Sequence, residues 1–266
     1  MNESLPKAKP TNLIQTIERV ADILDALAQY PGGMSLGELS ENVQLPKGTT
    51  HRFLSSLIYF GFVRQETTTK HYSLGFKLVE LGNRLLNQLD LREEARPFLV
   101  DLAQRIKETV HLVILDQQEI VYIDKLDAVN HDVGFRMTSR VGLRVPAHAC
   151  ASGKILLAHL SEEDLKQFIA TKELKKITEN TISDPEILKE QLKKIRAQGF
   201  ALDEQEREKG VRCVAAPIRN ESGKVVAAIS ISGTTVHLTK KIIENELRKE
   251  VVATALAISR KLGFRG

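Results

Sequence analysis

Residues 35–61 read SLGELSENVQLPKGTTHRFLSSLIYFG. Ser35 is a candidate helix N-cap, and Glu38 stands three positions later, as in a capping box. Pro46 interrupts the apolar pattern and suits the first turn of a new helix, where its missing N–H is not needed. Gly61 ends the second pattern. The stretch therefore predicts two helices joined by a tight turn.

The flanking residues complete this unit. Upstream, apolar residues recur at helical intervals from about Leu13 to Tyr30, and Pro31-Gly32-Gly33 ends that helix. Downstream, residues 62–66 and 71–75 read as two short strands around a polar turn. Three helices followed by a hairpin predict a winged helix-turn-helix, which is a DNA-binding unit.

The last of these helices has two different faces. One predicted face packs on the other helices and carries Thr50, Phe53, Leu54, Leu57 and Ile58. The opposite face is small, polar and cationic, as a reader of the major groove requires, and carries Lys47, Gly48, His51, Arg52 and Ser55. A protein-interaction module with a solvated basic face is the alternative, and the order of the elements favours DNA.

We expect seven residues of this unit to contact DNA. Those on the hairpin would hold the sugar-phosphate backbone, and those on the helix would face the groove. Residues 46–77 hold Lys or Arg at five positions against a single acidic residue, although the first 75 residues are neutral overall. The expected DNA contacts are Lys47, Thr49, Thr50, His51, Arg52, Arg64 and Lys70.

Leucines spaced by three or four residues continue from Leu74 to Leu89 and predict an amphipathic helix. Such a helix can join two domains and pair with its copy in a second chain, or it can be an ordinary core helix. Pro97 would kink or restart it, so a second domain is expected to begin near Leu91. We predict domains at 10–75 and 97–264, with a linker helix at 76–96.

From residue 110 onward, strand and helix patterns alternate. Hairpins are predicted around the turns at 116–119 and 219–223. Helices are predicted at 152–159, 162–170, 186–198 and 240–262, and further strand residues at 200–202. Antiparallel strands with helices packed around them predict an α+β domain that senses a ligand.

Composition excludes several classes of protein. The 266 residues suit two domains, and 42% hydrophobic with 27% charged residues is ordinary for a globular chain. Apolar runs fall far short of the roughly 18 residues of a membrane span, and the first ten residues do not resemble a secretory signal. Two cysteines make no disulfide framework, so we expect a reduced, cytoplasmic protein. The net charge of +4 permits a polyanionic partner without requiring one.

Several residues have types that could support chemistry. Residues 151–154 resemble part of a phosphate loop, but His148 and Ile155 stand where Gly and Ser or Thr are required. His148, Cys150, Asp203 and Cys213 are the residue types of a metal- or redox-responsive site or, less favoured, of a cysteine-dependent enzyme. Their spacing contains no CxxC or HxxxH pattern. We expect no enzyme activity, no metal and no cofactor.

Alternation along two predicted strands is more informative. A period of two places Val211, Cys213 and Ala215 on one face, and Ser230 and Ser232 together on the next strand. An unpaired buried hydroxyl costs about 1–3 kcal/mol, so these serines need partners. A polar ligand could supply them, and so could the backbone or ordered water.

Three motifs together resemble the IclR family of bacterial transcription regulators. They lie at 45–54, at 146–154, and at 210–218 followed by 228–233, and the similarity covers nearly the whole chain. The resemblance implies an amino-terminal winged helix that binds operator DNA, a linker helix, and a GAF-like carboxy-terminal α/β domain that binds a small effector, often a carboxylate. It also implies a homodimer or homotetramer, acting as a repressor or an activator.

The effector site follows from the same resemblance. Ser152 lies at a predicted helix start, where backbone N–H groups can receive an anion. Asp203 would repel an acid unless it accepts a hydroxyl proton or is itself neutral. The residues that match the family's effector pocket are Val145, Ala151, Ser152, Asp203, Val211, Cys213, Ser230 and Ser232.

Overall fold

The computed structural model describes residues 12–87, 90–127 and 137–265. It divides into two compact units, one ending at residue 88 and one beginning at residue 89, and each is described by itself. Residues 1–11, in which we expect no secretory signal, and Leu89 of the leucine pattern lie outside the described residues. Every described helix is too short or too polar to span a bilayer.

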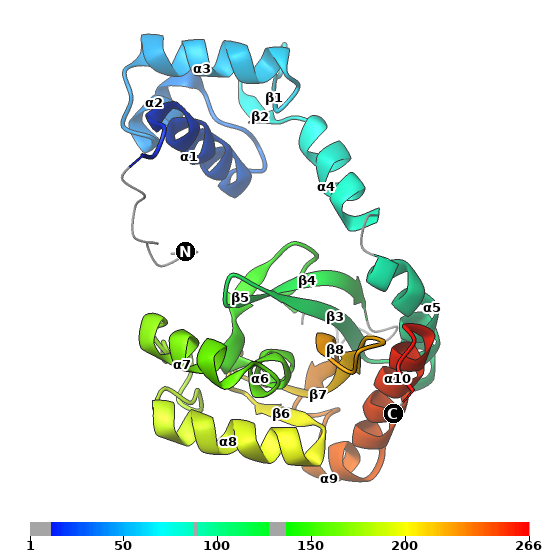
Figure 1. Cartoon of the computed structure of the whole chain (residues 1–266). Helices are drawn as coiled ribbons and strands as arrows, with labels where there is room; N and C mark the ends of the chain where they lie inside the picture. Colours follow the sequence, from blue (N-terminus) through cyan, green and yellow to red (C-terminus); the bar gives the residue numbers. More distant parts are fainter. Residues whose placement is uncertain (1–11, 88–89, 128–136, 266) are drawn as a thin grey trace. The chain divides into compact units, whose positions relative to one another are not determined.

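The first unit is a three-helix bundle followed by a hairpin (Figure 1). Its helices are α1 (Gln15–Gln29), α2 (Leu36–Asn42) and α3 (Lys47–Tyr59), and its antiparallel strands are β1 (Val63–Gln65) and β2 (Tyr72–Leu74). Helix α4 (Lys77–Asn87) follows. The predicted winged helix-turn-helix is confirmed in its elements and in their order.

Local signals explain these boundaries. The backbone N–H of Ser35 donates to Glu38 Oε2 at 2.8 Å, and the N–H of Glu38 donates to Ser35 Oγ at 3.3 Å, so the predicted capping box is present. Pro46 is the N-cap of α3. Leu54 and Leu57 are buried in the core of this unit, as predicted. The expectation for Ile58 is wrong, because the packing of α3 ends at Leu57 and the three residues that follow are exposed.

The second unit is built on a six-stranded antiparallel sheet with the order β5-β4-β3-β8-β7-β6. Both predicted hairpins are present, β3 with β4 and β7 with β8. The strands are β3 (Thr109–Asp116), β4 (Glu119–Leu126), β5 (Arg144–Pro146), β6 (Ala201–Glu204), β7 (Val211–Arg219) and β8 (Val225–Thr234).

Helices cover both faces of this sheet, which explains why β8 is buried along most of its length. One face packs on α6 (Ala151–Ala158), α7 (Glu162–Thr171) and α8 (Pro185–Gln198). Helices α5 (Asp90–Ile106) and α10 (Arg248–Lys261) contact each other and the sheet. The expected α+β architecture is therefore confirmed.

Two helices differ from their predicted form. Pro97 lies inside α5, so a helix restart at this proline is wrong. The predicted final helix consists of α9 (Lys240–Ile242), a π-helical turn over Ile243–Leu247, and α10. Hydrophobic periodicity does not distinguish a π turn from an uninterrupted α-helix, because the turn adds only a local change of register.

Candidate functional site

The outer surface of α3 carries four of the seven residues expected to contact DNA. Lys47, Thr49, His51 and Arg52 are all exposed. Gly48 lies between them, and a Cβ added there would meet nothing within 4 Å, so packing within the unit does not require glycine at this position. The surface combines donors and positive charge with little bulk, which suits close approach to a polyanion.

Thr50 is the exception among the expected DNA contacts. It is fully buried, and its hydroxyl donates to the carbonyl of Pro46 at 3.2 Å. Its position on the inward stripe of α3 is the physical reason. We therefore correct the expectation that Thr50 faces the groove.

Two exposed cations lie on the hairpin. Arg64 on β1 donates from Nε to Ser73 Oγ at 3.1 Å, and its guanidinium lies 5.4 Å from the centre of the Phe76 ring. Lys70 stands in the turn with a positive φ of 60° and donates its backbone N–H to the carbonyl of Glu66 at 3.0 Å. Both residues are exposed.

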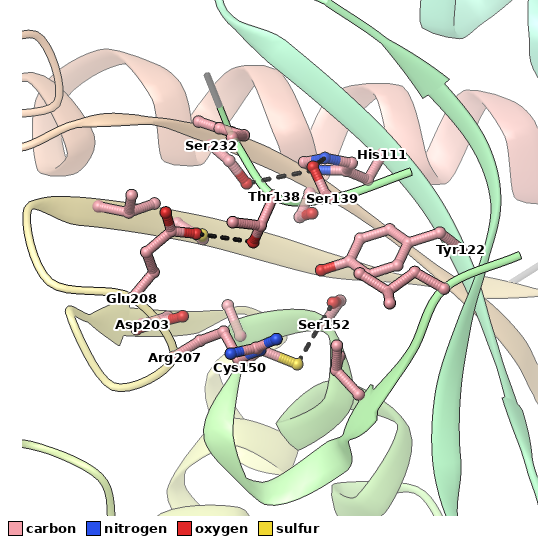
Figure 2. Close-up of a pocket in the computed structure, with 17 residues that line it drawn as sticks. His111, Tyr122, Thr138, Ser139, Cys150, Ser152, Asp203, Arg207, Glu208 and Ser232 are labelled. Atoms are coloured by element: carbon pink, nitrogen blue, oxygen red, sulfur yellow. Dashed lines mark hydrogen bonds between the residues drawn. The ribbon is translucent and has the colours of Figure 1, made fainter. Parts of the chain in front are cut away.

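A pocket opens on the face of the sheet that packs on α6 (Figure 2). All eight residues that match the family's effector pocket line it: Val145, Ala151, Ser152, Asp203, Val211, Cys213, Ser230 and Ser232. The space available to the centre of a water molecule is about 40 Å³, which is enough for a few waters. A larger ligand would have to move part of the wall.

Strand register brings these distant residues together. Asp203 on β6 pairs with Cys213 on β7, and Cys213 pairs with Ser232 on β8, so the three lie in one row across the sheet. Ser152 stands in the first turn of α6, which faces this row. The alternation predicted for β7 and β8 is the reason that their polar groups share one face.

His111 is a pocket residue that sequence reasoning missed. Its Nδ1 lies 3.3 Å from Ser232 Oγ, and its Nε2 lies 2.8 Å from Ser139 Oγ. Burial lowers the pKa of the His111 imidazole to about 3, so the ring is neutral at physiological pH. One ring nitrogen therefore donates and the other accepts, and the tautomer decides which serine hydroxyl accepts the hydrogen bond from the ring N–H. Tyr122 packs edge-on against this ring.

Asp203 is the most unusual ionisable group of the pocket. It is 2% exposed, and its Oδ1 accepts the backbone N–H of Glu206 at 2.6 Å. Burial, with a smaller contribution from the charge of the nearby Glu206, raises the pKa of the Asp203 carboxyl to about 7, against the opposing effects of backbone hydrogen bonds and of Lys154. Near neutral pH, a large fraction of Asp203 is therefore a neutral acid that can donate a hydrogen bond to an anionic ligand.

Two further charged side chains line the pocket and were also missed. Arg207 supplies a cation from the segment between β6 and β7. Glu208, from the same segment, accepts a hydrogen bond from Thr138 Oγ1 at 3.0 Å. Neither residue lies in a regular element, so periodicity could not place it.

The thiols do not favour a metal site or a nucleophile. Burial raises the pKa of Cys150 to about 11 and that of Cys213 well above its ordinary value, so both remain protonated. His148 points to another environment, where its Nε2 lies 3.1 Å from the carbonyl of Lys175. Within residues 12–87, 90–127 and 137–265, no group of three His, Cys, Asp or Glu side chains is placed to hold a metal ion.

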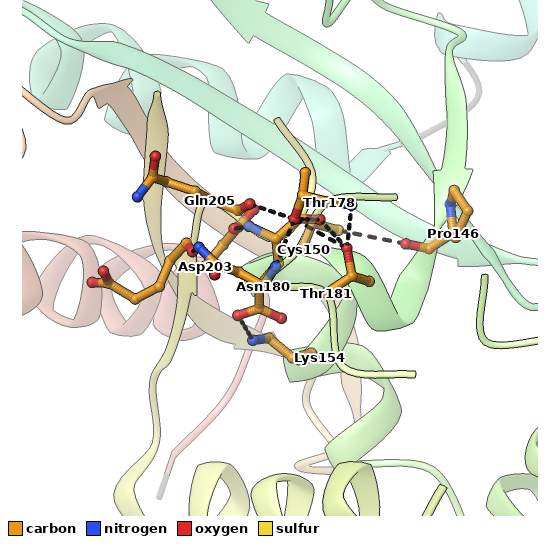
Figure 3. A network of polar contacts seen from close by, with 10 residues as sticks. Pro146, Cys150, Lys154, Thr178, Asn180, Thr181, Asp203 and Gln205 are labelled. Atoms are coloured by element: carbon orange, nitrogen blue, oxygen red, sulfur yellow. Dashed lines mark hydrogen bonds and ion pairs between the residues drawn. The ribbon is translucent and has the colours of Figure 1, made fainter. Parts of the chain in front are cut away.

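Lys154 lies behind the pocket and is fully buried. Its Nζ donates to Glu206 Oε1 at 2.5 Å (Figure 3). The preceding Gly153 packs directly on the backbone of Ala147, where a Cβ would collide with the carbonyl. The Ser-Gly-Lys sequence therefore serves helix packing and a buried ion pair, in agreement with its failure as a phosphate loop.

Comparison with known proteins gives a consistent result across the chain. The IclR helix-turn-helix domain matches residues 16–67, and the bacterial transcriptional regulator IclR C-terminal domain matches residues 83–260. The HTH-type transcriptional regulator XynR of Escherichia coli is 36% identical over 252 residues, which cover 95% of this chain and 98% of XynR.

Solved structures agree with these matches. The crystal structure of the Thermotoga maritima IclR has a TM-score of 0.80 and 38% identity, and the match covers 94% of this chain and 99% of that one. An IclR homolog from Microbacterium hydrocarbonoxydans complexed with 4-hydroxybenzoate has a TM-score of 0.80 and 26% identity, with 93% and 98% of the two chains covered.

Proposed function

The chain belongs to the IclR family of bacterial transcriptional regulators, and from this premise we propose that a small carboxylic acid in the pocket of its second unit controls how it binds operator DNA. The protein is a DNA-binding transcriptional regulator with a carboxy-terminal effector-binding domain. Its relatives are named regulators and repressors, so an enzyme is not the favoured alternative. Because bacterial operator DNA lies in the cytoplasm, we propose that the protein acts there.

Helix α3 is proposed to read the major groove. Lys47, Thr49, His51 and Arg52 form its free surface, and Arg64 and Lys70 on the hairpin would contact phosphates. Side chains of this kind supply donors to base edges and charge to the backbone. Thr50 is not included, since its hydroxyl is already bonded inside the unit.

We propose residues 10–75 as the DNA-binding domain, 76–96 as the linker and 97–264 as the effector domain, with the last part of the linker formed by the start of α5, which packs in the second unit. Residues in and beside α4 support self-association, because Phe76, Val79 and Leu81 are all exposed and apolar. A second copy would cover such a surface. A homodimer or a dimer of dimers would place two α3 helices on half-sites about one helical turn apart.

The observation that carries the effector proposal is the position of Asp203 in the pocket. As a neutral acid it can donate to a carboxylate, and Arg207 can pair with the remaining charge. Ser152 and the amino-terminal end of α6 add donors on the opposite side. The relative that binds 4-hydroxybenzoate has the same fold, which supports an acid ligand here.

Control of DNA binding then follows from differential affinity. The effector would stabilise one arrangement of the DNA-binding units over another, and its effect cannot exceed the difference between its affinities for the two. The small space in the pocket agrees with a wall that moves when a ligand enters.

A thermal-shift screen of small organic acids on the full chain tests this proposal, because a ligand that binds only the folded state raises the melting temperature. An acid found in this way should change operator affinity in a gel-shift assay. The double substitution Asp203→Ala with Ser232→Ala should remove that response and leave operator binding intact. Ser222→Ala, in the exposed turn between β7 and β8, is the matched control. A response that survives the double substitution would place the effector site elsewhere.

A further inference from the structure

The lining of the effector pocket contains more acidic than basic side chains. Among the described residues it holds two carboxyl groups, Asp203 and Glu208, and one permanent cation, Arg207 (Figure 2). Lys154 behind the pocket supplies no further charge, because its Nζ is already paired with Glu206 Oε1 at 2.5 Å. An acid anion that enters the pocket therefore adds negative charge to a lining in which carboxyl groups already outnumber cations.

Asp203 is the more enclosed of the two carboxyl groups. It is buried, whereas Glu208 is half-buried. The backbone N–H of Glu206 donates to Asp203 Oδ1 at 2.6 Å, which holds the carboxyl group in the pocket wall. Two carboxylates in contact within an enclosed site repel each other, and this repulsion raises the pKa of one of them until it takes up a proton. An ionised acid in the pocket therefore favours the protonated form of Asp203.

Four other titratable side chains face the pocket from the strands and from the start of α6, and they are uncharged at neutral pH. Burial lowers the pKa of His111 on β3 to about 3. Burial also raises the pKa of the Tyr122 phenol on β4 well above its ordinary value. The thiols of Cys150, before α6, and Cys213, on β7, have raised pKa values for the same reason. Of these five groups, Asp203 is the one that titrates near neutral pH, since burial raises its pKa to about 7.

We propose that an acid effector enters this pocket as its anion together with one proton from the solvent, and that Asp203 and the effector carboxylate share this proton. The acid and the proton then strengthen each other's binding, and the coupling is reciprocal. Affinity for the acid falls as the pH rises above neutrality, because the ionised form of Asp203 repels the anion. This proton uptake rests on the proposed effector site, and it makes the response of the regulator to an acid depend on pH.

Isothermal titration calorimetry of the full chain measures the proton uptake. The probes are 4-hydroxybenzoate, pyruvate and D-gluconate, whose carboxyl groups titrate near about 4 or below and are ionised at neutral pH. A probe that binds should give different heats in phosphate and in Tris buffer, because the buffer supplies the proton. The uptake should be about 0.5 proton at about pH 7, where part of Asp203 is already protonated, and nearly one at about pH 8. The Kd of the same probe should rise about fivefold between these two pH values.

Asp203→Asn and Glu208→Gln are a matched pair, because each removes one carboxyl group from the same lining and nearly preserves its size. Asp203→Asn offers an amide donor in place of the acid proton, so it should bind the probe without proton uptake and with the same Kd at both pH values. At about pH 8 it should bind more tightly than the parent chain, whose Asp203 is mostly ionised there. A purely structural role of Asp203 would weaken binding instead. Glu208→Gln should keep the proton uptake and the dependence of Kd on pH.

Two results would overturn the proton uptake and leave the effector site standing. The first is a probe that binds with equal heats in the two buffers and with the same Kd at both pH values. The second is unchanged proton uptake in Asp203→Asn. If that variant does not fold, the carboxyl carbon signal of Asp203 in the ¹³C-labelled parent chain decides, because it must move toward its protonated position when the probe is added. If no acid binds at all, the effector proposal fails, and the proton uptake fails with it.

Discussion

Arg96 on α5 donates through a single Nη1 to both carboxylate oxygens of Asp124 on β4, at 2.6 and 2.5 Å. The carboxylate is 2% exposed, and Arg92 lies 3.7 Å from the same group, with its own Nε buried and without a hydrogen-bond partner among the described residues. Two arginines of one helix thus converge on one buried acid of the sheet. This arrangement fixes α5, the first helix of the second unit, to the strand that also carries the pocket residue Tyr122.

Asp124→Asn should therefore destabilise the second unit. The substitution leaves the geometry nearly unchanged but removes the charge that two guanidinium groups face, and we expect a loss of about 1–3 kcal/mol in the free energy of unfolding. Urea unfolding of the full chain measures it. Asp101→Asn breaks an exposed pair with Arg105 and should cost about 0.5 kcal/mol or less. Equal losses in the two variants would contradict a special role for Asp124.

Gly153→Ala and Gly82→Ala should change stability in opposite directions. A Cβ at Gly153 would overlap the carbonyl of Ala147, so the start of α6 must shift, at a cost of about 1–3 kcal/mol. Gly82 lies inside α4, and a Cβ there meets nothing within 4 Å, so alanine should stabilise that helix by about 1 kcal/mol. Thermal unfolding followed by circular dichroism measures both. A gain of stability in Gly153→Ala would contradict the packing described here.

Much of the fold can be predicted from the sequence because the features that start and end its elements act over a few neighbouring residues. The capping box of Ser35 and Glu38 and the turn at 219–223 act within a few residues, and the structure contains both. For the same reason, the sequence predicts which side chains share one face of a single helix or strand. The period of two correctly groups Ser230 with Ser232, and the helical period places Thr50 on the buried side of α3.

The remaining site residues depend on which strands become neighbours. His111 reaches Ser232 only because β3 pairs with β8, although 121 positions separate the two residues. Within β3, His111 is surrounded by apolar residues, and nothing in that local sequence indicates that its side chain has a polar partner. Arg207 and Glu208 lie outside regular structure, so no period places them. Lys154 and Glu206 meet across 52 positions, and only tertiary structure makes them a pair.

The stability of the second unit should fall as pH rises from about 5 to about 7, because of Asp203. The pKa of this carboxyl is raised in the folded state to about 7, whereas an unfolded Asp titrates near about 3.9. A group whose pKa is raised in the folded state contributes fully to stability when the pH is below its unfolded-state pKa. That contribution is lost as the pH rises through the folded-state pKa. The slope from this group is at most about 1.4 kcal/mol per pH unit.

Asp203→Asn isolates this effect, since asparagine cannot titrate. Urea unfolding at about pH 5 and about pH 7 should show a smaller decline for the variant than for the parent chain. Ser232→Ala changes the same pocket without removing the carboxyl, so it should retain the parent's decline. An identical pH dependence in Asp203→Asn and the parent would show that Asp203 is ionised over the whole range.

Arg52→Ala and Lys70→Ala should weaken operator binding in different ways. Arg52 lies on the free face of α3, so its loss should cost about 1–3 kcal/mol on the operator and little on unrelated DNA, if it contacts a base edge. Lys70 lies in the hairpin turn, so its loss should weaken all sequences alike. It should also reduce the slope of log K against log salt by about 1, since one phosphate contact disappears.

Fluorescence anisotropy on operator and scrambled duplexes, at several salt concentrations, separates the two effects. Arg19→Ala in α1, where half-buried Arg19 pairs with Asp22, removes a cation of the same unit that is not among the proposed DNA contacts and is the matched control. Because every variant carries one charge fewer, a general electrostatic role would lower all three affinities equally and change all three salt slopes. That result would contradict the assignment of α3 as the reading helix. A sequence-dependent loss confined to Arg52→Ala requires that its side chain reach the bases.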